Sequence, residues 1–266
     1  KAGIPIEDVE VTVSFWRRKY DYGDRKVTQQ ALQQQIIKTF RKGQILPTQV
    51  NLVGWSRGGI SCHMLANAML ADPVLTTIPV NIFAVDPVPG TGNFKSDKVT
   101  LGSNVKEYVA FYAKDERSTG FSCVIPETHN TTRVHIYPMS GRHATLVGNA
   151  SANGDKGPKV AHEPGMIVRH FAEVCLQRWG VNMDKKLNLD GIQLLELHQS
   201  IQRNAAVFSQ MRNTVYTVSE NDQGERYVSR ASTGMPFSAV HGVPFTPESG
   251  LVSEYLTNQA IYDVLK

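Results

Sequence analysis

Cysteine is scarce in this chain, and the three cysteines that it has lie far apart in the sequence. Cys62, Cys123 and Cys175 form no C-x-x-C pair and no metal-ligand pattern, and an odd count gives no disulfide framework. Cys62 and Cys175 fall within apolar helix patterns, which is typical of small core residues. Histidine pairs with the spacing of a zinc site are also missing. The sequence therefore favours neither a disulfide scaffold nor a metallohydrolase, and we expect no metal.

Long apolar runs and long basic runs are missing too. No apolar run approaches the length that crosses a bilayer, and residues 1–5 lack the apolar segment of a signal peptide. Because the chain does not begin with Met, we interpret it as processed or trimmed. The net charge of +4 is mild, and the densest basic cluster, residues 17–19, is interpreted as a solvated loop. We expect a soluble protein with no nucleic-acid partner, because no recognisable nucleic-acid module is present.

The composition and the order of patterns are those of an α/β protein. The chain has 266 residues, 41% hydrophobic and 20% charged, which suits one large domain or a core with an added subdomain. Strand and helix patterns alternate through the first half. The expected strands are 9–15, 50–53, 80–85, 105–113 and 133–137, and the expected helices are 29–41 and about 57–70. This order predicts a mostly parallel, doubly wound sheet, whose functional residues gather beyond the carboxyl ends of the strands.

The second half has a different pattern, richer in helices. A glycine-rich and polar segment, residues 148–157, is the best candidate for a mobile loop. Helices are expected at about 164–179 and 190–211, a hairpin is expected from 214–219 and 226–230, and a closing helix is expected at 251–265 after a break at 244–247. We therefore divide the chain into a core of residues 1–150 and a helical and hairpin region, residues 151–266, that completes or caps the core.

A serine motif lies at the junction of a predicted strand and a predicted helix. Residues 54–58 read Gly-Trp-Ser-Arg-Gly, which fits G-x-S-x-G. In α/β-hydrolases this serine sits on a sharp strand-to-helix turn that exposes its hydroxyl above the sheet. Small residues flank it because the backbone is strained and the strand passes close to the helix. The alternative is a glycine-rich turn with an incidental serine. The context favours Ser56 as a nucleophile.

A serine hydroxyl needs a base to take its proton, and a carboxylate best orients that base. Asp86 directly follows the 80–85 strand, although an Asp before a Pro also commonly opens a loop as an Asx turn. Asp115, and secondarily Glu116, follows the 105–113 strand and is the alternative carboxylate. For these two residues we favour a surface charge cluster with Lys114 and Arg117. Asp86 is the preferred triad acid.

The base is expected on a loop after the last core strand. His143 follows the 133–137 strand in a glycine-bearing loop, and it completes the chain order serine, acid, histidine that this fold requires. His241 is the alternative base, and His162 is a weaker candidate. The backbone N–H of Arg57, at the start of a helix, is expected to form half of an oxyanion hole. The second donor is not identified, although residues 15–17 are one source to consider.

Four sequence blocks resemble a known family. Residues 54–59 look like the G-F-S-R-G-A elbow of bacterial type VI secretion lipase effectors and related α/β-hydrolase domains, and residues 83–88 are similar to their F-x-x-D-T-V. Residues 113–121 resemble their A-x-D-E-R-R-x-x-F, and residues 137–148 resemble their W-F-P-G-x-H-x-D-x-G-G. The chain departs from these patterns at Pro87, at Thr145 and at Asn149, and the early D-G-T-x-N segment of the family is absent.

The resemblance implies an α/β-hydrolase with Ser56, Asp86 and His143 as its triad, and it makes Asp115 structural. It implies a serine esterase that acts on lipid or phospholipid acyl esters, with no cofactor, with peripheral membrane contact, and with an unidentified immunity or host partner. A secreted bacterial effector without a classical signal peptide is the corresponding location. A soluble-ester or thioester hydrolase fits the same triad. A catalytically silent α/β-hydrolase scaffold that serves as a binding or effector module remains the alternative from a different class.

Overall fold

The computed structural model describes part of the chain in enough detail for a structural account. The described residues are 19–22, 25–28, 34, 37–38, 46–90, 95–118, 120–148, 162–211, 227–230 and 233–236.

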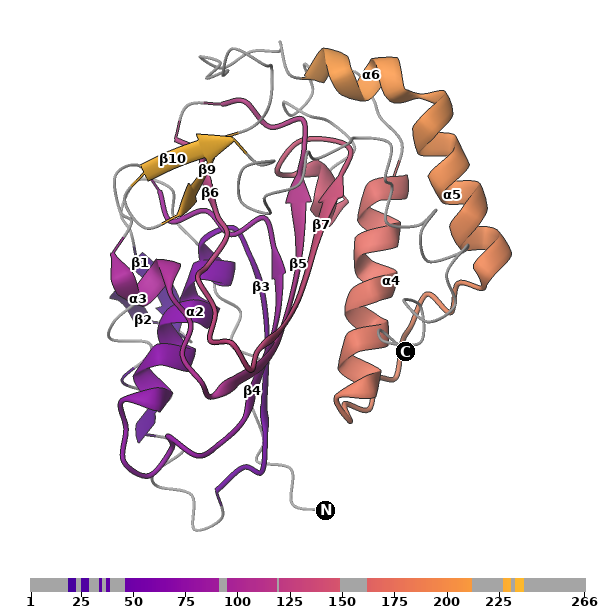
Figure 1. Ribbon diagram of the computed structural model, residues 1–266. Coiled ribbons are helices and arrows are strands. Elements are labelled where there is room, and N and C mark those ends of the chain that lie inside the picture. Colours follow the sequence, from indigo (N-terminus) through magenta and orange to yellow (C-terminus); the bar gives the residue numbers. More distant parts are fainter. Residues whose placement is uncertain are drawn as a thin grey trace.

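A four-stranded parallel sheet lies at the centre of the described fold (Figure 1). Its strands are β3 (Val50–Trp55), β4 (Val80–Val85), β5 (Val105–Ala113) and β7 (Arg133–Met139), in the order β3-β4-β5-β7. All three neighbouring pairs are parallel. The expected parallel α/β sheet is confirmed. The bounds of β4 and β5 agree with the sequence pattern, whereas β3 and β7 each continue for two more residues.

Helices cover both faces of this sheet. On one face α2 (Arg57–Leu70) packs against alternate residues of β4 such as Ile82 and Ala84. On the other face α4 (Glu163–Arg178) packs against the intervening residues such as Phe83 and Val85. Figure 1 shows the two helices on opposite sides of the sheet. Every residue of β4 is buried, as expected for a central strand covered on both faces.

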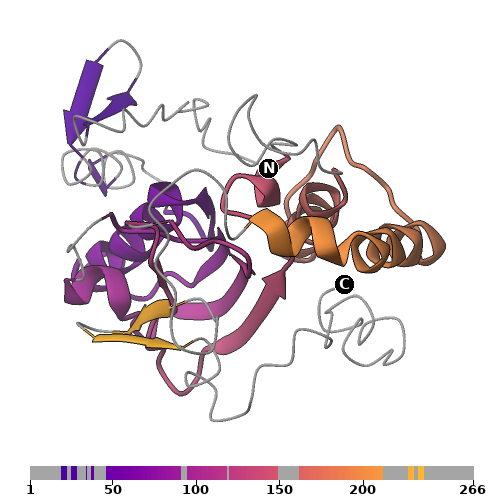
Figure 2. The same ribbon diagram turned by 90° about the horizontal axis from the view of Figure 1, so that it is seen from above.

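Further helices extend the α4 side of the fold. They are α5 (Gly191–Arg203) and α6 (Ala205–Gln210), and in Figures 1 and 2 α5 lies beyond α4 as seen from the sheet. The single helix expected over 190–211 is therefore wrong. Asn204 leaves helical geometry with φ −98° and ψ 17°, and its side chain donates to the backbone oxygen of Ser200 at 2.9 Å. The Asn204 backbone N–H also donates to the Ser200 oxygen, at 3.1 Å, so Asn204 closes α5 as its C-cap and α6 begins at the next residue.

Short elements surround the central sheet. These are the antiparallel pair β1 (Lys19–Tyr22) and β2 (Arg25–Thr28), the short helix α3 (Ser96–Val99), the 3-10 turn η1 (Thr145–Val147), and a second sheet of β6 (Cys123–Val124), β9 (Tyr227–Arg230) and β10 (Thr233–Pro236). In that sheet β9 lies between β10, which is antiparallel to it, and β6, which is parallel to it. The 226–230 strand is thus confirmed, but its hairpin partner is β10.

Several sequence predictions lie outside the described residues. These are the strand 9–15, most of the helix 29–41, the loop from 149 to 157, the hairpin arm 214–219, the break 244–247 and the closing helix 251–265. Within 29–41, Gln34, Ile37 and Lys38 are helical, and Ile37 is buried as expected. Cys62 and Cys175 are buried free thiols, also as expected.

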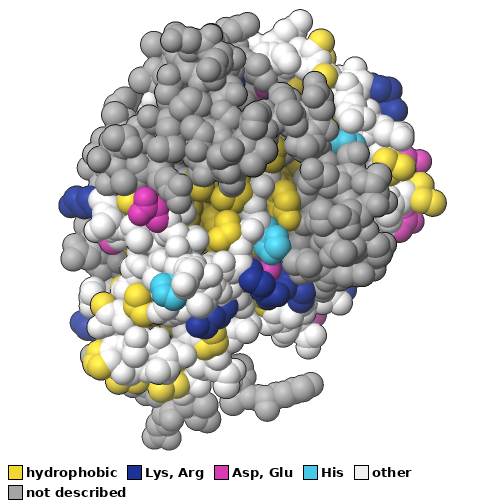
Figure 3. Space-filling model, in the orientation of Figure 1, with side chains coloured by type: hydrophobic (Ala, Val, Ile, Leu, Met, Phe, Trp, Pro, Cys, Tyr) yellow, Lys and Arg dark blue, Asp and Glu magenta, His cyan; other side chains and the backbone are white. Residues whose placement is uncertain are grey.

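Two properties of the described surface and helices bear on partners. Among the described residues, no helix is both long enough and apolar enough to cross a membrane. On the face drawn in Figure 3, the described Lys and Arg side chains lie in small separate groups.

Candidate active site

Ser56 sits on the turn that joins β3 to α2. Its backbone has φ 57° and ψ −124°, a conformation that non-glycine residues rarely adopt. Strain of this kind persists only where the surrounding structure enforces it, and it gathers at functional sites. Ser56 occupies the N-cap position of α2, yet its hydroxyl makes no capping hydrogen bond to the helix. The hydroxyl is therefore not committed to stabilising the helix start.

The close approach of strand and helix explains one glycine of the motif. A Cβ added at Gly54 would lie 2.4 Å from the backbone carbonyl of Gly58, which no real side chain tolerates. A Cβ added at Gly58 would meet nothing within 4 Å. Gly59, which follows the motif, faces Pro87, whose Cβ would lie 3.0 Å from an added Cβ. The close approach expected around the serine is thus found at Gly54, whereas Gly58 is not sterically required.

Backbone hydrogen bonds tie the Ser56 turn to the end of β4. The Ser56 N–H donates to the oxygen of Val85 at 2.9 Å, and the Val88 N–H donates to the oxygen of Ser56 at 3.2 Å. These two bonds bracket Asp86, which is fully buried and has φ 44°. Asp86 Oδ1 accepts the backbone N–H of Ala113 at 3.1 Å. The side chain is thus anchored at the carboxyl end of β5, and the Asx turn considered for it is not needed to explain its position.

His143 and Asp86 are in direct contact. His143 Nδ1 lies 2.6 Å from Asp86 Oδ2, and the imidazole is 7% exposed. Because a carboxylate can only accept, Nδ1 carries the proton in this bond and Nε2 is left as the basic nitrogen. The imidazole ring packs beside the Trp55 indole, with ring centroids 4.9 Å apart, and against the edge of Phe121 at 5.1 Å. The structure therefore brings together the acid and the base preferred from the sequence.

The serine and the histidine are not hydrogen-bonded to each other. Within the described part of the chain, the Ser56 hydroxyl forms no hydrogen bond to His143 or to any other residue. Serine–histidine hydrogen bonds are often long or misaligned without substrate and tighten when it binds. Arg57 is the first residue of α2, at the positive end of the helix dipole. This is the position at which an oxyanion donor was expected.

Asp115 has a different role from Asp86. It is fully buried, and its Oδ2 accepts the backbone N–H of Gly141 at 2.8 Å. Its own N–H donates to the oxygen of Gly141 at 3.1 Å. Asp115 therefore fixes the loop that carries His143, while the imidazole itself is bonded to Asp86.

The surface charge cluster expected around Asp115 and Glu116 is wrong. Asp115, Glu116 and Arg117 are all buried, with at most 4% of their surface exposed. Glu116 forms an ion pair with Arg142, with Oε1 at 3.1 Å from Nη2. Burial is possible because the carboxylate is met by several donors at once, which offsets its loss of water.

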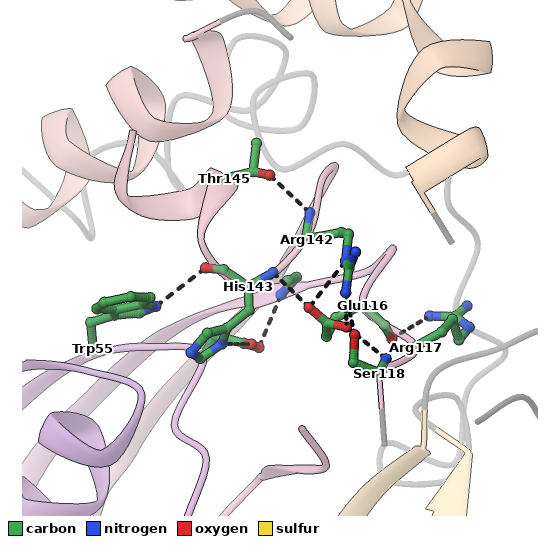
Figure 4. A network of polar contacts seen from close by, with 9 residues as sticks. Trp55, Glu116, Arg117, Ser118, Arg142, His143 and Thr145 are labelled. Carbon is green, nitrogen blue, oxygen red and sulfur yellow. Dashed lines mark hydrogen bonds and ion pairs between the residues drawn. The ribbon is translucent and has the colours of Figure 1, made fainter. Parts of the chain in front are cut away.

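Glu116 also contacts the backbone of the loop that carries His143, as Figure 4 shows. Its Oε2 accepts the backbone N–H of His143 at 3.3 Å, and its Oε1 accepts the N–H of Ser118 at 2.7 Å. Arg142 additionally donates to the Ser118 hydroxyl, and its own N–H donates to Thr145 Oγ1 at 3.1 Å. On the other side of His143, the Trp55 indole N–H donates to the His143 oxygen at 3.2 Å. None of Trp55, Arg142 and Thr145 was predicted as a site residue, because no local pattern marks contacts between residues so far apart.

A buried polar chain lies under the α2 side of the site. His63 Nδ1 donates to the Lys98 oxygen at 2.8 Å, and His63 Nε2 contacts the Tyr108 hydroxyl at 3.2 Å. The Tyr112 hydroxyl, 3.2 Å from that of Tyr108, donates to the Val124 oxygen. Burial lowers the pKa of His63 to about 4, an effect that the bond to Lys98 only partly opposes. Burial also raises the pKa of Tyr108 and of Tyr112, and the nearby Asp86 charge adds to both shifts.

The remaining candidates fall outside this site. His162 is exposed at the start of α4. His241 and residues 15–17 lie outside the described residues. In the described part of the chain, no group of three or more His, Cys, Asp or Glu side chains is arranged to hold a metal ion. No protein-family model matches this chain, and no curated protein matches it at a significant level.

Proposed function

We propose that the protein is a serine hydrolase of the α/β-hydrolase type that cleaves carboxylic esters, with lipid or phospholipid acyl esters as the favoured substrates. The observation that carries this proposal is the 2.6 Å contact between His143 Nδ1 and Asp86 Oδ2 beside a serine held at φ 57°. The order serine, acid, histidine along the chain and the position of each residue beyond a parallel strand support it.

In the proposed reaction Ser56 Oγ attacks the ester carbonyl carbon, and its proton passes to His143 Nε2. Asp86 holds the Nδ1–H tautomer and stabilises the imidazolium that forms. The Arg57 N–H and the α2 dipole stabilise the oxyanion. The proton on Nε2 then goes to the leaving alcohol, which departs as the acyl–Ser56 ester forms. A water that loses its proton to His143 releases the acid and restores Ser56.

Apolar exposure near these residues supports an apolar substrate. Trp55, which precedes Ser56, is 41% exposed, and Val147, four residues after His143, is 45% exposed. An acyl chain that covers such side chains gains about 25 cal/mol for each Å² of apolar surface removed from water. With a phospholipid substrate, the protein would meet the membrane peripherally.

A fluorophosphonate probe tests the proposal directly. We expect one probe molecule per chain on the intact protein, and none on Ser56→Ala. Ser61→Ala is the matched control, because Ser61 lies five residues on and its hydroxyl donates to the Arg57 oxygen inside α2. Labelling that survives in Ser56→Ala would refute Ser56 as the nucleophile, and no labelling of the folded protein would refute the proposal and favour a silent scaffold. Comparing phospholipid vesicles with short soluble esters then decides the substrate class.

A further inference from the structure

The backbone of His143 is held on both sides by side chains from other parts of the sheet. Glu116, in the loop that follows β5, accepts the N–H of His143 at 3.3 Å. Trp55, the last residue of β3, donates its indole N–H to the His143 oxygen at 3.2 Å. The Trp55 ring also lies beside the imidazole, with centroids 4.9 Å apart and planes inclined by 31°.

These two contacts differ in what they connect. Glu116 links the His143 loop to β5, whereas Trp55 links it to the strand that leads directly into Ser56. Since the Ser56 backbone is fixed by its bonds to Val85 and Val88, a side chain one residue earlier has a fixed origin relative to the hydroxyl. A donor at Trp55 therefore sets where His143 sits relative to Ser56.

We propose that Trp55 is a positioning residue that holds the His143 imidazole in register with Ser56, through its indole N–H and its ring. This inference rests on the proposed function, because it assigns the part that Trp55 has at the same site. Trp55 transfers no proton. It acts through the His143 backbone and through the face of the imidazole. The rate of the chemical step falls steeply when reacting groups are displaced even slightly. Loss of a positioning contact is therefore expected to lower mainly kcat.

Trp55→Phe keeps a ring and removes the N–H donor. One neutral hydrogen bond contributes about 0.5–1.5 kcal/mol, so we expect kcat on a short soluble ester to fall about 3- to 10-fold with KM little changed. Trp55→Leu removes the ring as well, and we expect a fall of about 10- to 100-fold. The rate of labelling by a small dialkyl fluorophosphate is expected to fall in the same order.

Trp179→Phe is the matched control. The Trp179 indole N–H donates to Glu107 Oε2 at 2.8 Å, near the amino end of β5 and away from the strand ends that carry Ser56 and Asp86. This variant removes an indole N–H donor as Trp55→Phe does, although its acceptor is a carboxylate, so we expect it to lower stability and to leave kcat unchanged. If Trp55→Phe and Trp179→Phe give equal kcat values after correction for the folded fraction, the inference is overturned.

A proton NMR measurement separates this inference from the proposed function. Because the bond between His143 Nδ1 and Asp86 is short, we expect a far-downfield Nδ1–H signal whether or not Ser56 reacts, and therefore in Ser56→Ala too. We expect Trp55→Phe to shift or broaden this signal, and Trp179→Phe to leave it in place. If the Ser56 labelling experiment fails but Trp55→Phe shifts the signal, the hydrolase function is refuted and the positioning of the His143 imidazole by Trp55 is supported. If Trp55→Phe is labelled at the normal rate and its signal does not shift, the positioning role is refuted while the hydrolase function stands.

Discussion

Replacing Asp86 by Asn is expected to change which nitrogen of His143 carries the proton. Asp86 Oδ1 accepts the N–H of Ala113 at 3.1 Å, and Oδ2 accepts Nδ1–H of His143 at 2.6 Å. An Asn here has only one acceptor oxygen. The buried Ala113 N–H needs that oxygen, so the amide NH₂ turns toward Nδ1 and forces it to accept.

In that tautomer the proton sits on Nε2, the atom that takes the proton from Ser56 in the proposed reaction. Triad enzymes with this change lose about 10⁴-fold in kcat, or about 5 kcal/mol of transition-state stabilisation. We expect a loss of that order in Asp86→Asn, measured as kcat on a soluble ester and as the labelling rate with a fluorophosphonate. Thermal unfolding of the variant checks that the fold is kept.

Asp115→Asn is the matched control for this change. Asp115 Oδ2 accepts the Gly141 N–H at 2.8 Å, and an Asn oxygen can still accept that bond. Loss of charge weakens the bond by about 1 kcal/mol, so kcat is expected to stay within about tenfold of the original. If Asp115→Asn abolishes turnover while Asp86→Asn leaves it nearly intact, the assigned triad is wrong.

Two stability predictions follow from buried contacts near the site. Gly54→Ala is expected to lower the free energy of unfolding by about 1–3 kcal/mol or more, because its Cβ would lie 2.4 Å from the Gly58 carbonyl. Gly58→Ala, which meets nothing within 4 Å, is expected to raise it by about 0.5–1 kcal/mol, and urea unfolding that ranks the two in the opposite order would contradict the geometry. Burial lowers the pKa of His63 from 6.5 to about 4, so the unfolded chain binds a proton more readily, and stability is lost as pH falls from 6.5 through 4. We expect this residue to account for about 2 kcal/mol of the loss between pH values near 7.5 and near 5, and His63→Gln should show a correspondingly shallower pH dependence of its urea midpoint.

The strands of the central sheet could be predicted because both of their faces are buried. A strand such as β4, in which every residue is apolar or paired, produces a short apolar run between turn residues. The predictions for β3 and β7 stopped two residues early. Gly54 and Trp55 read as part of the turn, although they pair in register with Ala84 and Val85 of β4.

The choice between the two carboxylates could be favoured from the sequence but not decided. Asp86 and Asp115 follow neighbouring parallel strands, so both side chains reach the same edge of the sheet. The two carboxylates differ in the group of the His143 loop that donates a hydrogen bond to them. Asp86 meets the His143 ring, whereas Asp115 meets the Gly141 backbone in the same loop. The order of the parallel strands places both carboxylates at the carboxyl end of the sheet. Only the three-dimensional arrangement of the loops decides which residue each carboxylate contacts.

The prediction of a surface charge cluster at residues 114–117 was wrong because the ion-pair partner of Glu116 is far away along the chain. Four charged residues in a row are typical of a solvated surface, and the partner, Arg142, lies in a different loop 26 residues later. The pair closes only when β5 and β7 lie side by side and bring their carboxyl ends together. No local pattern reports that contact.

The buried Glu116–Arg142 ion pair is better explained by the loop geometry that it fixes than by a contribution to the stability of the fold. Burying two charges costs several kcal/mol per ion, and apolar replacements of such pairs are often neutral or stabilising. Glu116, however, also accepts the N–H groups of His143 and Ser118, while Arg142 donates its own N–H to Thr145. An apolar pair of equal volume would leave the backbone N–H groups of His143 and Ser118 without the Glu116 carboxylate that accepts them, and would release the loop. The charges therefore fix the position of the His143 peptide, which Trp55 fixes from the other side, and the site depends on both.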